Sequence, residues 1–143
     1  MLNQLTVFIQ NTEGRLAQLC RVLADNGINM HSLYVADTVD FGVARIFCDT
    51  PRAARKALNN AGFRVTVIPV IGVKVPNRKG GLADLLELID STGVNIEYGY
   101  CFSVNQEYAI DVLKVDDDHN DMEAILEKAG YELVKKEEIY QRD

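Results

Sequence analysis

The sequence EGRLAQLCRVLADNGINM at residues 13–30 returns, in altered form, as KGGLADLLELIDSTGVNI at residues 79–96. At this offset of 66 residues the two stretches share Gly, Leu, Ala, Leu, Gly and Asn, six identities in 18 positions. Unrelated sequences of average composition would share about one. The 143-residue chain is therefore predicted to be an internal duplication, with one domain at residues 1–69 and a second at residues 70–143.

The similarity continues beyond the two stretches. Tyr34 aligns with Tyr100 and Ile46 with Val112 at the same offset. After a two-residue insertion near Asp116, A-G-F at 61–63 aligns with A-G-Y at 129–131. Two copies are too few, and the period is too long, for a solenoid, so each copy is expected to fold as a unit.

The hydrophobic period changes in the same order within each copy. Residues 5–9 and 71–75 have the pattern of strands, whereas residues 16–23 and 82–89 place apolar side chains at helical spacing. Gly27 and Gly93 follow these helices, where a left-handed residue commonly ends a helix. Two extended runs come next in each copy, and polar turns join them: 28–36 with 43–48 across 37–42, and 94–103 with 108–115 across 105–107.

A second helix and a closing strand complete each copy. In copy one the helix begins after Thr50, an N-cap residue followed by Pro51, and in copy two it begins after residues 118–120. Gly62 and Gly130 end these helices, and closing strands are expected at 63–70 and 131–139. The order βαββαβ predicts an α+β fold of two tandem ferredoxin-like units with antiparallel sheets.

Helices in this architecture cover only one face of each four-stranded sheet. Simple alternation along residues 94–102 predicts that one face of this strand is apolar and that the other carries few charges. Because exposed apolar patches are usually contact surfaces, the units or two chains are expected to pair, and a homodimer is predicted. The apolar face comprises Val94, Ile96, Tyr98, Tyr100 and Phe102, and the other comprises Asn95, Glu97, Gly99 and Cys101.

Composition limits the possible partners. The net charge is −6 and the basic residues are scattered, so neither nucleic acid nor an anionic membrane is expected to bind. The longest apolar run, at 65–75, is shorter than the roughly 20 residues that span a bilayer. The sequence at 1–15 has no basic n-region or cleavage site, so a cytoplasmic protein is expected.

No cofactor or metal site is apparent. Cys20, Cys48 and Cys101 lie in apolar stretches without the spacing of zinc ligands, and we expect them to be buried, reduced thiols. The acids at 116–127 match several EF-hand ligand positions, but Asp121 occupies the position that requires glycine. Asn120 and Glu123 have the spacing of a helix capping box, which explains these residues without calcium.

The combination of these motifs resembles the ACT domain family of small-molecule regulatory modules. In each copy a strand is followed by a glycine loop, L-x-x-L on a helix, and G-[IV]-N-[IMV] entering the next strand. The matching residues are 11–16 with 27–30, and 76–82 with 93–96, so the resemblance covers the whole chain twice. No catalytic domain accompanies the copies. The chain therefore looks like a stand-alone tandem ACT protein of the bacterial kind.

The resemblance implies an amino-acid-binding regulatory protein that modulates a partner enzyme and is not itself an enzyme. The ligand of such proteins lies where the loop after the first strand meets a neighbouring ACT unit. Helix-start N–H groups suit a carboxylate, and Asn side chains offer both a donor and an acceptor. The expected ligand-binding residues are Asn11, Glu13, Gly14, Arg15, Leu16, Asn29 and Met30 in copy one and Asn77, Lys79, Gly80, Gly81, Leu82, Asn95 and Ile96 in copy two.

The two copies are not expected to bind equally. Arg15 adds a positive charge where copy two has Gly81, which favours the first copy's loop for a carboxylate. Glu13 and Lys79 replace the proline that often precedes the glycine in this family. His31 shares a strand face with Asn29, but a structural role is the more common one for a lone histidine.

Two other classes of function compete with this interpretation. An interaction or dimerisation module would retain the pairing surface of the ACT fold without a ligand. An acylphosphatase-like enzyme would share the ferredoxin-like fold and use an arginine and an asparagine, and Arg15 lies in roughly the right loop. Copy two lacks that arginine, and no other catalytic motif is present in the sequence.

Overall fold

The computed structural model describes residues 1–37, 41–116 and 121–141. The first copy contains β1 (Leu2–Gln10), α1 (Arg15–Asp25), β2 (Met30–Asp37), β3 (Phe41–Cys48) and α2 (Pro51–Asn60), and it leads into a long strand, β4 (Arg64–Pro76). The second copy adds α3 (Gly81–Ser91), β5 (Asn95–Val104), β6 (Tyr108–Asp116), α4 (Met122–Lys128), β7 (Glu132–Leu133) and a 3-10 helix, η1 (Lys136–Glu138). The element order is βαββαβ twice, with β4 shared by both copies, which confirms the predicted fold class.

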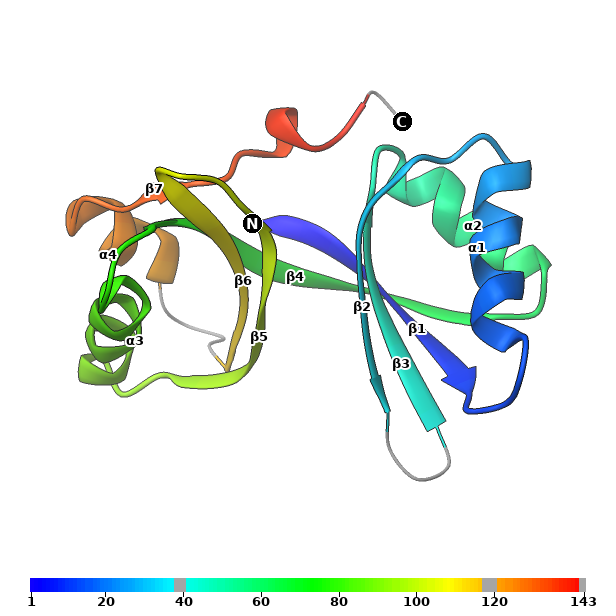
Figure 1. The fold of residues 1–143 in the computed structure, drawn as a ribbon, viewed down its shortest axis with the longest axis horizontal. Coiled ribbons are helices and arrows are strands. Elements are labelled where there is room, and N and C mark those ends of the chain that lie inside the picture. The colour runs from blue at the N-terminus through cyan, green and yellow to red at the C-terminus, as the bar shows by residue number, and fades with distance from the viewer. Residues whose placement is uncertain (38–40, 117–120, 142–143) are drawn as a thin grey trace. The chain divides into compact units, whose positions relative to one another are not determined.

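The chain divides into two compact units, seen in Figure 1. The N-terminal unit comprises Asn3–Ile68 together with Lys136–Asp143. The C-terminal unit comprises Met1–Leu2 together with Pro69–Lys135. Each unit therefore contains one copy of the repeat and a short segment from the opposite end of the chain.

The strands of the N-terminal unit follow the order β2-β3-β1-β4, in which β3 pairs antiparallel with both β1 and β2. Figure 1 shows α1 and α2 on the same side of these strands. Alternate residues of β1 therefore face the helices, as the sequence pattern predicts. The core includes Leu5, Val7 and Ile9 of β1, Leu19 and Leu23 of α1, and Ala54 and Leu58 of α2.

The C-terminal unit repeats this arrangement with the order β5-β6-β4-β7. Its strands pair antiparallel, and α3 and α4 supply the helical layer. The core includes Ile71, Val73 and Val75 of β4, Leu85 and Ile89 of α3, Leu113 and Val115 of β6, and Met122 and Leu126 of α4. Both sheets are antiparallel, as predicted.

One boundary differs from the sequence prediction. The strands expected at 63–70 and 71–75 form a single strand, β4, that belongs to both copies. Pro69 lies near the predicted break and lacks an N–H group, but its fixed φ is compatible with extended backbone. Because Val70 and Ile71, which follow it, favour extended backbone, the strand continues through the predicted break.

The closing strand expected at 131–139 was also wrong in its extent. Only Glu132–Leu133 pair with β4, and the N–H of Val134 still donates to the carbonyl of Gly72 at 2.8 Å. In the charged sequence KKEE at 135–138, the last three residues form η1 instead of a strand. Four consecutive charged residues cannot alternate between a buried and an exposed face, so the strand ends where they begin.

The register of the sheets corrects the alignment of the two copies. Leu5 pairs with Ile46, and the equivalent Ile71 pairs with Leu113 rather than with Val112. The offset is therefore 67 residues in β3 and β6 (113 minus 46). Residue by residue, Ala44 of β3 corresponds to Asp111 of β6.

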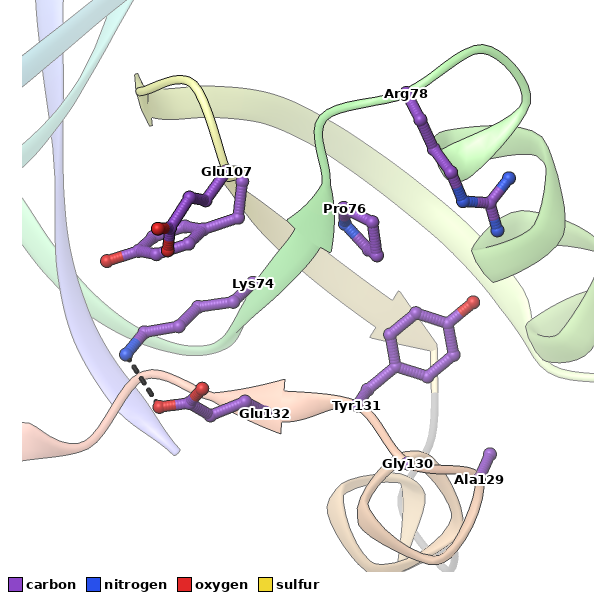
Figure 2. Close-up of a pocket in the computed structure, with 9 residues that line it drawn as sticks. Lys74, Pro76, Arg78, Glu107, Ala129, Gly130, Tyr131 and Glu132 are labelled. Atoms are coloured by element: carbon purple, nitrogen blue, oxygen red, sulfur yellow. Dashed lines mark hydrogen bonds and ion pairs between the residues drawn. The ribbon is translucent and has the colours of Figure 1, made fainter.

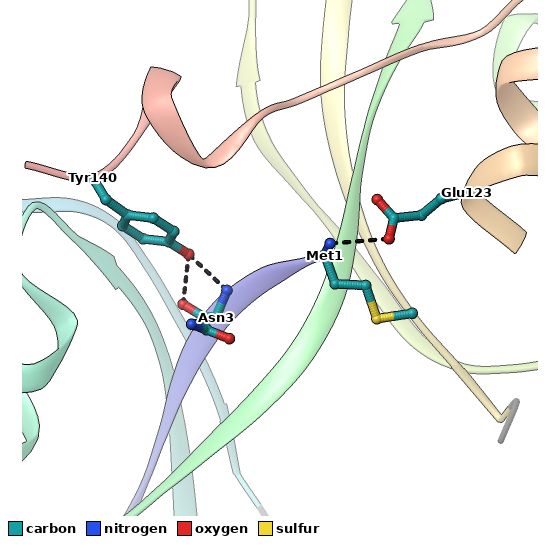
Figure 3. Close-up of polar contacts among 4 residues, drawn as sticks. All are labelled: Met1, Asn3, Glu123 and Tyr140. Carbon is teal, nitrogen blue, oxygen red and sulfur yellow. Dashed lines mark hydrogen bonds and ion pairs between the residues drawn. The ribbon is translucent and has the colours of Figure 1, made fainter. Parts of the chain in front are cut away.

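Helix starts differ from the expected caps. Thr50 occupies the N-cap position of α2, but no side chain caps this helix; the Thr50 hydroxyl donates to Asp49 at 3.1 Å. Asp118 and Asn120, considered for capping and for calcium, lie outside the described residues. Glu123 of α4 binds the amino group of Met1 at 2.9 Å (Figure 3).

The last residues of the described chain are fastened to the N-terminal unit. The Tyr140 hydroxyl accepts a hydrogen bond from the Asn3 N–H at 2.7 Å and donates to the Asn3 carbonyl at 2.8 Å (Figure 3). Burial raises the pKa of Tyr140 to about 12. The N–H of Gln141 donates to the carbonyl of Asp49 at 2.8 Å, and Ile139 is buried. Residues 139–141 thus complete the N-terminal unit.

Candidate ligand-binding site

Each unit starts its first helix from a glycine in the left-handed region. Gly14 before α1 has φ 82°, and Gly80 before α3 has φ 81°. A residue with a Cβ atom would be strained in this conformation. Gly81 is restricted by space instead, because an added Cβ would collide with the carbonyl oxygen of Pro76. The glycine loops predicted from the repeat therefore have a clear structural role.

The helix-start N–H groups are partly used within these loops. The N–H of Gly81 donates to the carbonyl of Arg78 at 3.0 Å, and Arg15 makes the corresponding bond in the N-terminal unit at 3.3 Å. No residue in the described chain accepts a hydrogen bond from the next two N–H groups of α3, those of Leu82 and Ala83. These two groups, near the positive end of the helix dipole, can receive a carboxylate.

Arg15 is occupied within the N-terminal unit. Its guanidinium carbon lies 4.0 Å from the ring centroid of Phe63, and its Nη1 donates to Gln18 at 2.8 Å. A guanidinium on an aromatic face gains a cation–π attraction. Leu16, the next residue, is partly exposed at 36%. The positive charge that favoured the first copy is therefore already held by an aromatic ring.

Asn29 is positioned by its backbone. Its N–H donates to the carboxylate of the buried Asp49 at 3.1 Å, and its carbonyl accepts from the Asp49 N–H at 3.0 Å. His31 lies with its Nε2 3.1 Å from the carbonyl of Ile139, which supports a structural role. Met30 packs against the core of the unit, while Asn11 and Glu13 are exposed in the loop before α1.

The loop before α3 is tied to the β5–β6 hairpin. The Asn77 N–H donates to the Glu107 carbonyl at 2.9 Å, and its side-chain amide donates to the Asn105 carbonyl at 2.7 Å. Asn77 therefore holds two loops together. Lys79 is exposed at the tip of the loop. The hairpin turn itself is the one predicted at 105–107.

Two adjoining pockets lie along α3 and β5, and together they form what we call the α3–β5 groove. The first has a volume of about 510 Å³ and the second of about 440 Å³, and both are lined by Leu86 and Ile96. Of the residues predicted from sequence, Leu82 lines the first pocket, Asn95 the second and Ile96 both, whereas Asn77, Lys79, Gly80 and Gly81 line neither. The first pocket is completed by Gly99, Tyr100, Cys101, Asp111 and Leu113, and the second by Asp90, Gly93 and Val94.

A β-bulge decides which side chains of β5 face the groove. The pairing of β5 with β6 shifts between Ile96 and Tyr98, so the simple alternation predicted for residues 94–102 was wrong. Beyond the bulge, Gly99 pairs with Leu113, which belongs to the helix-facing core. Directly paired residues share one face of a sheet, so Gly99 and its second neighbour Cys101 face α3. Tyr98 and Tyr100 face the other way.

The two units differ where the groove lies. In the N-terminal unit Leu33 pairs with Ile46 and Val35 with Ala44. In the C-terminal unit Gly99 pairs with Leu113 and Cys101 with Asp111. Leu33, Val35 and Ala44 thus correspond to Gly99, Cys101 and Asp111. Two large apolar residues and an alanine are replaced by a glycine, a thiol and a carboxylate.

Asp111 is the charged member of the first pocket. Its carboxylate makes no hydrogen bond or ion pair with any residue of the described chain. Burial raises the pKa of Asp111 above 3.8, because the ionised form is poorly hydrated there. The pKa of Cys101 is also raised, first by burial and then by the nearby Asp111 charge. The groove therefore holds an uncompensated acid.

A third pocket lies on the other side of β4, with a volume of about 480 Å³. Figure 2 shows Lys74 and Glu132 paired at one end of it and Arg78 at the other. Lys74 Nζ lies 2.8 Å from Glu132 Oε1 and 5.3 Å from the ring centroid of Tyr108. Arg78 pairs with Asp84 at 2.7 Å. Lys74, Glu132 and Arg78 are thus paired within the unit, and the remaining charged residue, Glu107, is exposed, which makes this pocket a weaker candidate than the groove.

The cysteines and the possible metal ligands are the other chemically reactive groups of the chain. All three cysteines are free, with Cys48 buried and Cys20 half-buried. Cys101 is exposed, so the expectation that every thiol is buried was wrong; the bulge in β5 places it at the groove. Across residues 1–37, 41–116 and 121–141, no group of three His, Cys, Asp or Glu side chains could hold a metal ion. In the same ranges every helix is too short or too polar to span a bilayer.

Comparison with known proteins identifies the family. A family model described as an ACT domain pair matches residues 1–141. The chain belongs to the ACT domain family. Protein BT0572 from Bacteroides thetaiotaomicron is 34% identical in a crystal structure, with a TM-score of 0.83, over 92% of this chain and 90% of that one. None of the curated proteins compared with the sequence matches it.

The ACT fold is also shared with regulatory subunits of aspartate kinase. The subunit from Thermus thermophilus, in its ligand-free form, has a TM-score of 0.61 at 18% identity, over 78% of this chain and 81% of that one. The subunit from Thermus flavus has a TM-score of 0.59 at 21% identity, over 78% and 80% of the two chains. At these identities the likeness concerns the fold.

Two residues of the C-terminal ACT unit were missed by sequence reasoning. Gly99 and Asp111 line the groove, but alternation assigned Gly99 away from the apolar face, and the misaligned offset hid the equivalence of Asp111 with Ala44. A charged residue inside the apolar run YAIDVLKV at 108–115 was the available signal.

Proposed function

We propose that this ACT domain pair is a cytoplasmic regulatory protein that binds a free L-amino acid and modulates a partner enzyme, without catalysing a reaction itself. The observation that carries the proposal is the α3–β5 groove. Leu82, Asn95 and Ile96 are among the residues expected from the repeat and the resemblance to the ACT family, and all three line the groove. The ACT family membership and the shared fold with aspartate kinase regulatory subunits agree with a regulatory role.

The chemistry of the groove suits an amino acid. The N–H groups of Leu82 and Ala83 are available for a carboxylate, and Asn95 can donate to or accept from the ligand. A pocket of about 510 Å³ falls within the usual range for small-molecule sites. Since Arg15 is held against Phe63, the C-terminal unit is the better candidate, and not the first copy's loop.

The first test is a thermal-shift screen of the twenty amino acids. Ligand at about 100 times its Kd stabilises the fold by roughly 2.7 kcal/mol, which raises the melting temperature by roughly 5 to 10 °C for a chain of this size. Asn95→Ala is expected to reduce the shift, because the residue lines the groove. Asn29→Ala is the matched control at the equivalent position of the other unit and is expected to respond as the parent does.

Two results would contradict the proposal. If no amino acid changes the melting temperature, the protein does not sense amino acids. If Asn95→Ala and the parent show the same shift, the ligand binds elsewhere. The interaction-module alternative predicts the first result together with stable co-purification of one enzyme.

A further inference from the structure

The α3–β5 groove distinguishes the two ACT units by three corresponding positions. Where the N-terminal unit has Leu33, Val35 and Ala44, the C-terminal unit has Gly99, Cys101 and Asp111. We propose that the groove binds a ligand in which a positively charged ammonium group is attached to an apolar body, and that the Asp111 carboxylate receives the ammonium. This inference deepens the proposed function and rests on it only in assigning a small molecule to the groove.

The Asp111 carboxylate is half-buried but has no charged or hydrogen-bonding partner in the described chain. Asp111 is half-buried and takes the place of Ala44, which has 0% exposure in the other unit. Buried charges are normally paired, because an unpaired one loses hydration without compensation. No residue of the described chain forms an ion pair or hydrogen bond with the carboxylate of Asp111. A cationic ligand supplies what is missing.

The other residues that line the pocket indicate that the rest of the ligand is apolar. Leu82, Leu86, Ile96 and Leu113 present aliphatic side chains to the pocket. Leu82 is 46% exposed, so it contributes apolar surface that the folded unit does not itself bury. An aliphatic group of the ligand in contact with these residues removes apolar area of both the ligand and the protein from water. Among the described residues that line this pocket, Asp111 is the only charged one.

Gly99 keeps the pocket open. A Cβ atom added to Gly99 would lie 2.8 Å from Cδ2 of Leu113 and 3.2 Å from the carbonyl oxygen of Val112. Any side chain here would press on Leu113 and reduce the space next to Asp111. The corresponding residue of the N-terminal unit, Leu33, shows that the fold accepts a large side chain at this position of the strand.

Three probes separate the parts of the ligand: L-leucine, 3-methylbutylamine, which lacks the carboxylate, and 4-methylpentanoate, which lacks the ammonium. Binding is measured by isothermal titration calorimetry at pH 7.5. L-leucine and 3-methylbutylamine are expected to bind. 4-Methylpentanoate is expected to bind at least about tenfold more weakly than L-leucine, because its only charge is repelled by Asp111.

The matched variants are Asp111→Asn and Glu87→Gln. Each removes one negative charge without changing side-chain shape, but Glu87 is exposed on α3 and does not line the groove. Asp111→Asn is expected to weaken L-leucine and the amine by at least about tenfold, and Glu87→Gln to change neither. Gly99→Leu is expected to abolish binding of both by filling the pocket, and far-ultraviolet circular dichroism reports whether each variant is folded.

The outcomes distinguish this inference from the proposed function. If 3-methylbutylamine binds through Asp111 and no amino acid does, the inference stands and amino-acid sensing fails. If an amino acid binds equally well to the parent and to Asp111→Asn, amino-acid sensing stands and the inference is overturned. Binding of 4-methylpentanoate as tight as that of the amine also overturns it.

Discussion

Asp111 connects the stability of the C-terminal unit with its proposed function. Well below the ordinary pKa of an aspartate, the Asp111 carboxyl is protonated in both the folded and the unfolded chain. Because burial raises the folded-state pKa, the unfolded chain releases its proton first as the pH rises. The unfolded state then binds fewer protons, so the stability contributed by Asp111 is lost as the pH passes through the folded pKa.

The resulting prediction is that Asp111→Asn raises the melting temperature at pH 7 by roughly 2 to 5 °C. The gain should shrink as the pH is lowered through the raised folded-state pKa of Asp111, because below it the parent also carries a neutral side chain. Scanning calorimetry at several pH values measures both effects, with Glu87→Gln as the control that shows neither. An Asp111→Asn variant that melts no higher than the parent at pH 7 would remove the argument from burial.

At the scale of single residues, the sequence predicted the lining of the groove least well. Leu82, Asn95 and Ile96 could be predicted because the repeat marks them in both copies. Gly99 and Asp111 could not, because they matter through their difference from Leu33 and Ala44, and a repeat search finds similarity. The contact of Arg15 and Asn77 with ligand stays a prediction, and the structure adds contacts of both side chains within the chain.

At the level of elements, β2 and β5 occupy equivalent edges of their units but expose different surfaces. Leu33, Tyr34 and Val35 are consecutive on β2 and are 36%, 42% and 41% exposed. On β5 the exposed large hydrophobic residue is Val104, and two register shifts interrupt the pairing of that strand. The pairing of β2 shifts once, between Met30 and Ser32, and is regular from there to Asp37. An apolar edge strand with regular pairing invites another chain, whereas bulges discourage it.

We therefore predict that the homodimer expected from the sequence forms through β2. Val35→Lys should convert the dimer to a monomer of 16.0 kDa, because a lysine on an edge strand opposes pairing. Val104→Lys is the equivalent change on β5 and should leave the dimer intact. Light scattering coupled to size exclusion measures the mass; a monomeric parent, or a dimer that survives Val35→Lys, would rule out this interface.

The order of elements could be predicted almost completely, because alternation and helical spacing are local properties of the sequence. The failures occurred where a single residue changes the geometry. The bulge near Ile96 moves the side chains of the following residues to the opposite face of the sheet. No residue type at that position indicates a bulge. The charged run at 135–138 was predicted as strand because the first copy has a strand in that place, so the repeat outweighed the local pattern.

For the whole molecule, the segment at 136–141 is expected to stabilise the N-terminal unit. Deleting residues 136–143 removes the buried Ile139 and the bonds made by Tyr140 and Gln141. One buried aliphatic side chain and several hydrogen bonds amount to roughly 3 kcal/mol of unfolding free energy. Tyr140→Phe, which removes one hydroxyl, should cost about 1 kcal/mol.

Urea unfolding followed by circular dichroism measures these losses. Gln141→Ala is the control, since Gln141 contributes its backbone N–H to the bond with Asp49 and the variant retains that group. Equal midpoints for the parent and the truncated chain would show that the segment adds no stability. The same unfolding comparison tests the domain boundary proposed between residues 69 and 70. An N-terminal unit cut there would lack the segment at 136–143 that belongs to it.

The exchange of end segments between the two units also affects how the chain is made. A ribosome completes residues 3–68 well before it reaches residues 136–141, so the N-terminal unit emerges without its last part. During that interval His31, Asp49 and Asn3 lack the partners that the finished chain provides. Translation that stops before residue 136 therefore leaves even the first copy without contacts that its folded unit contains.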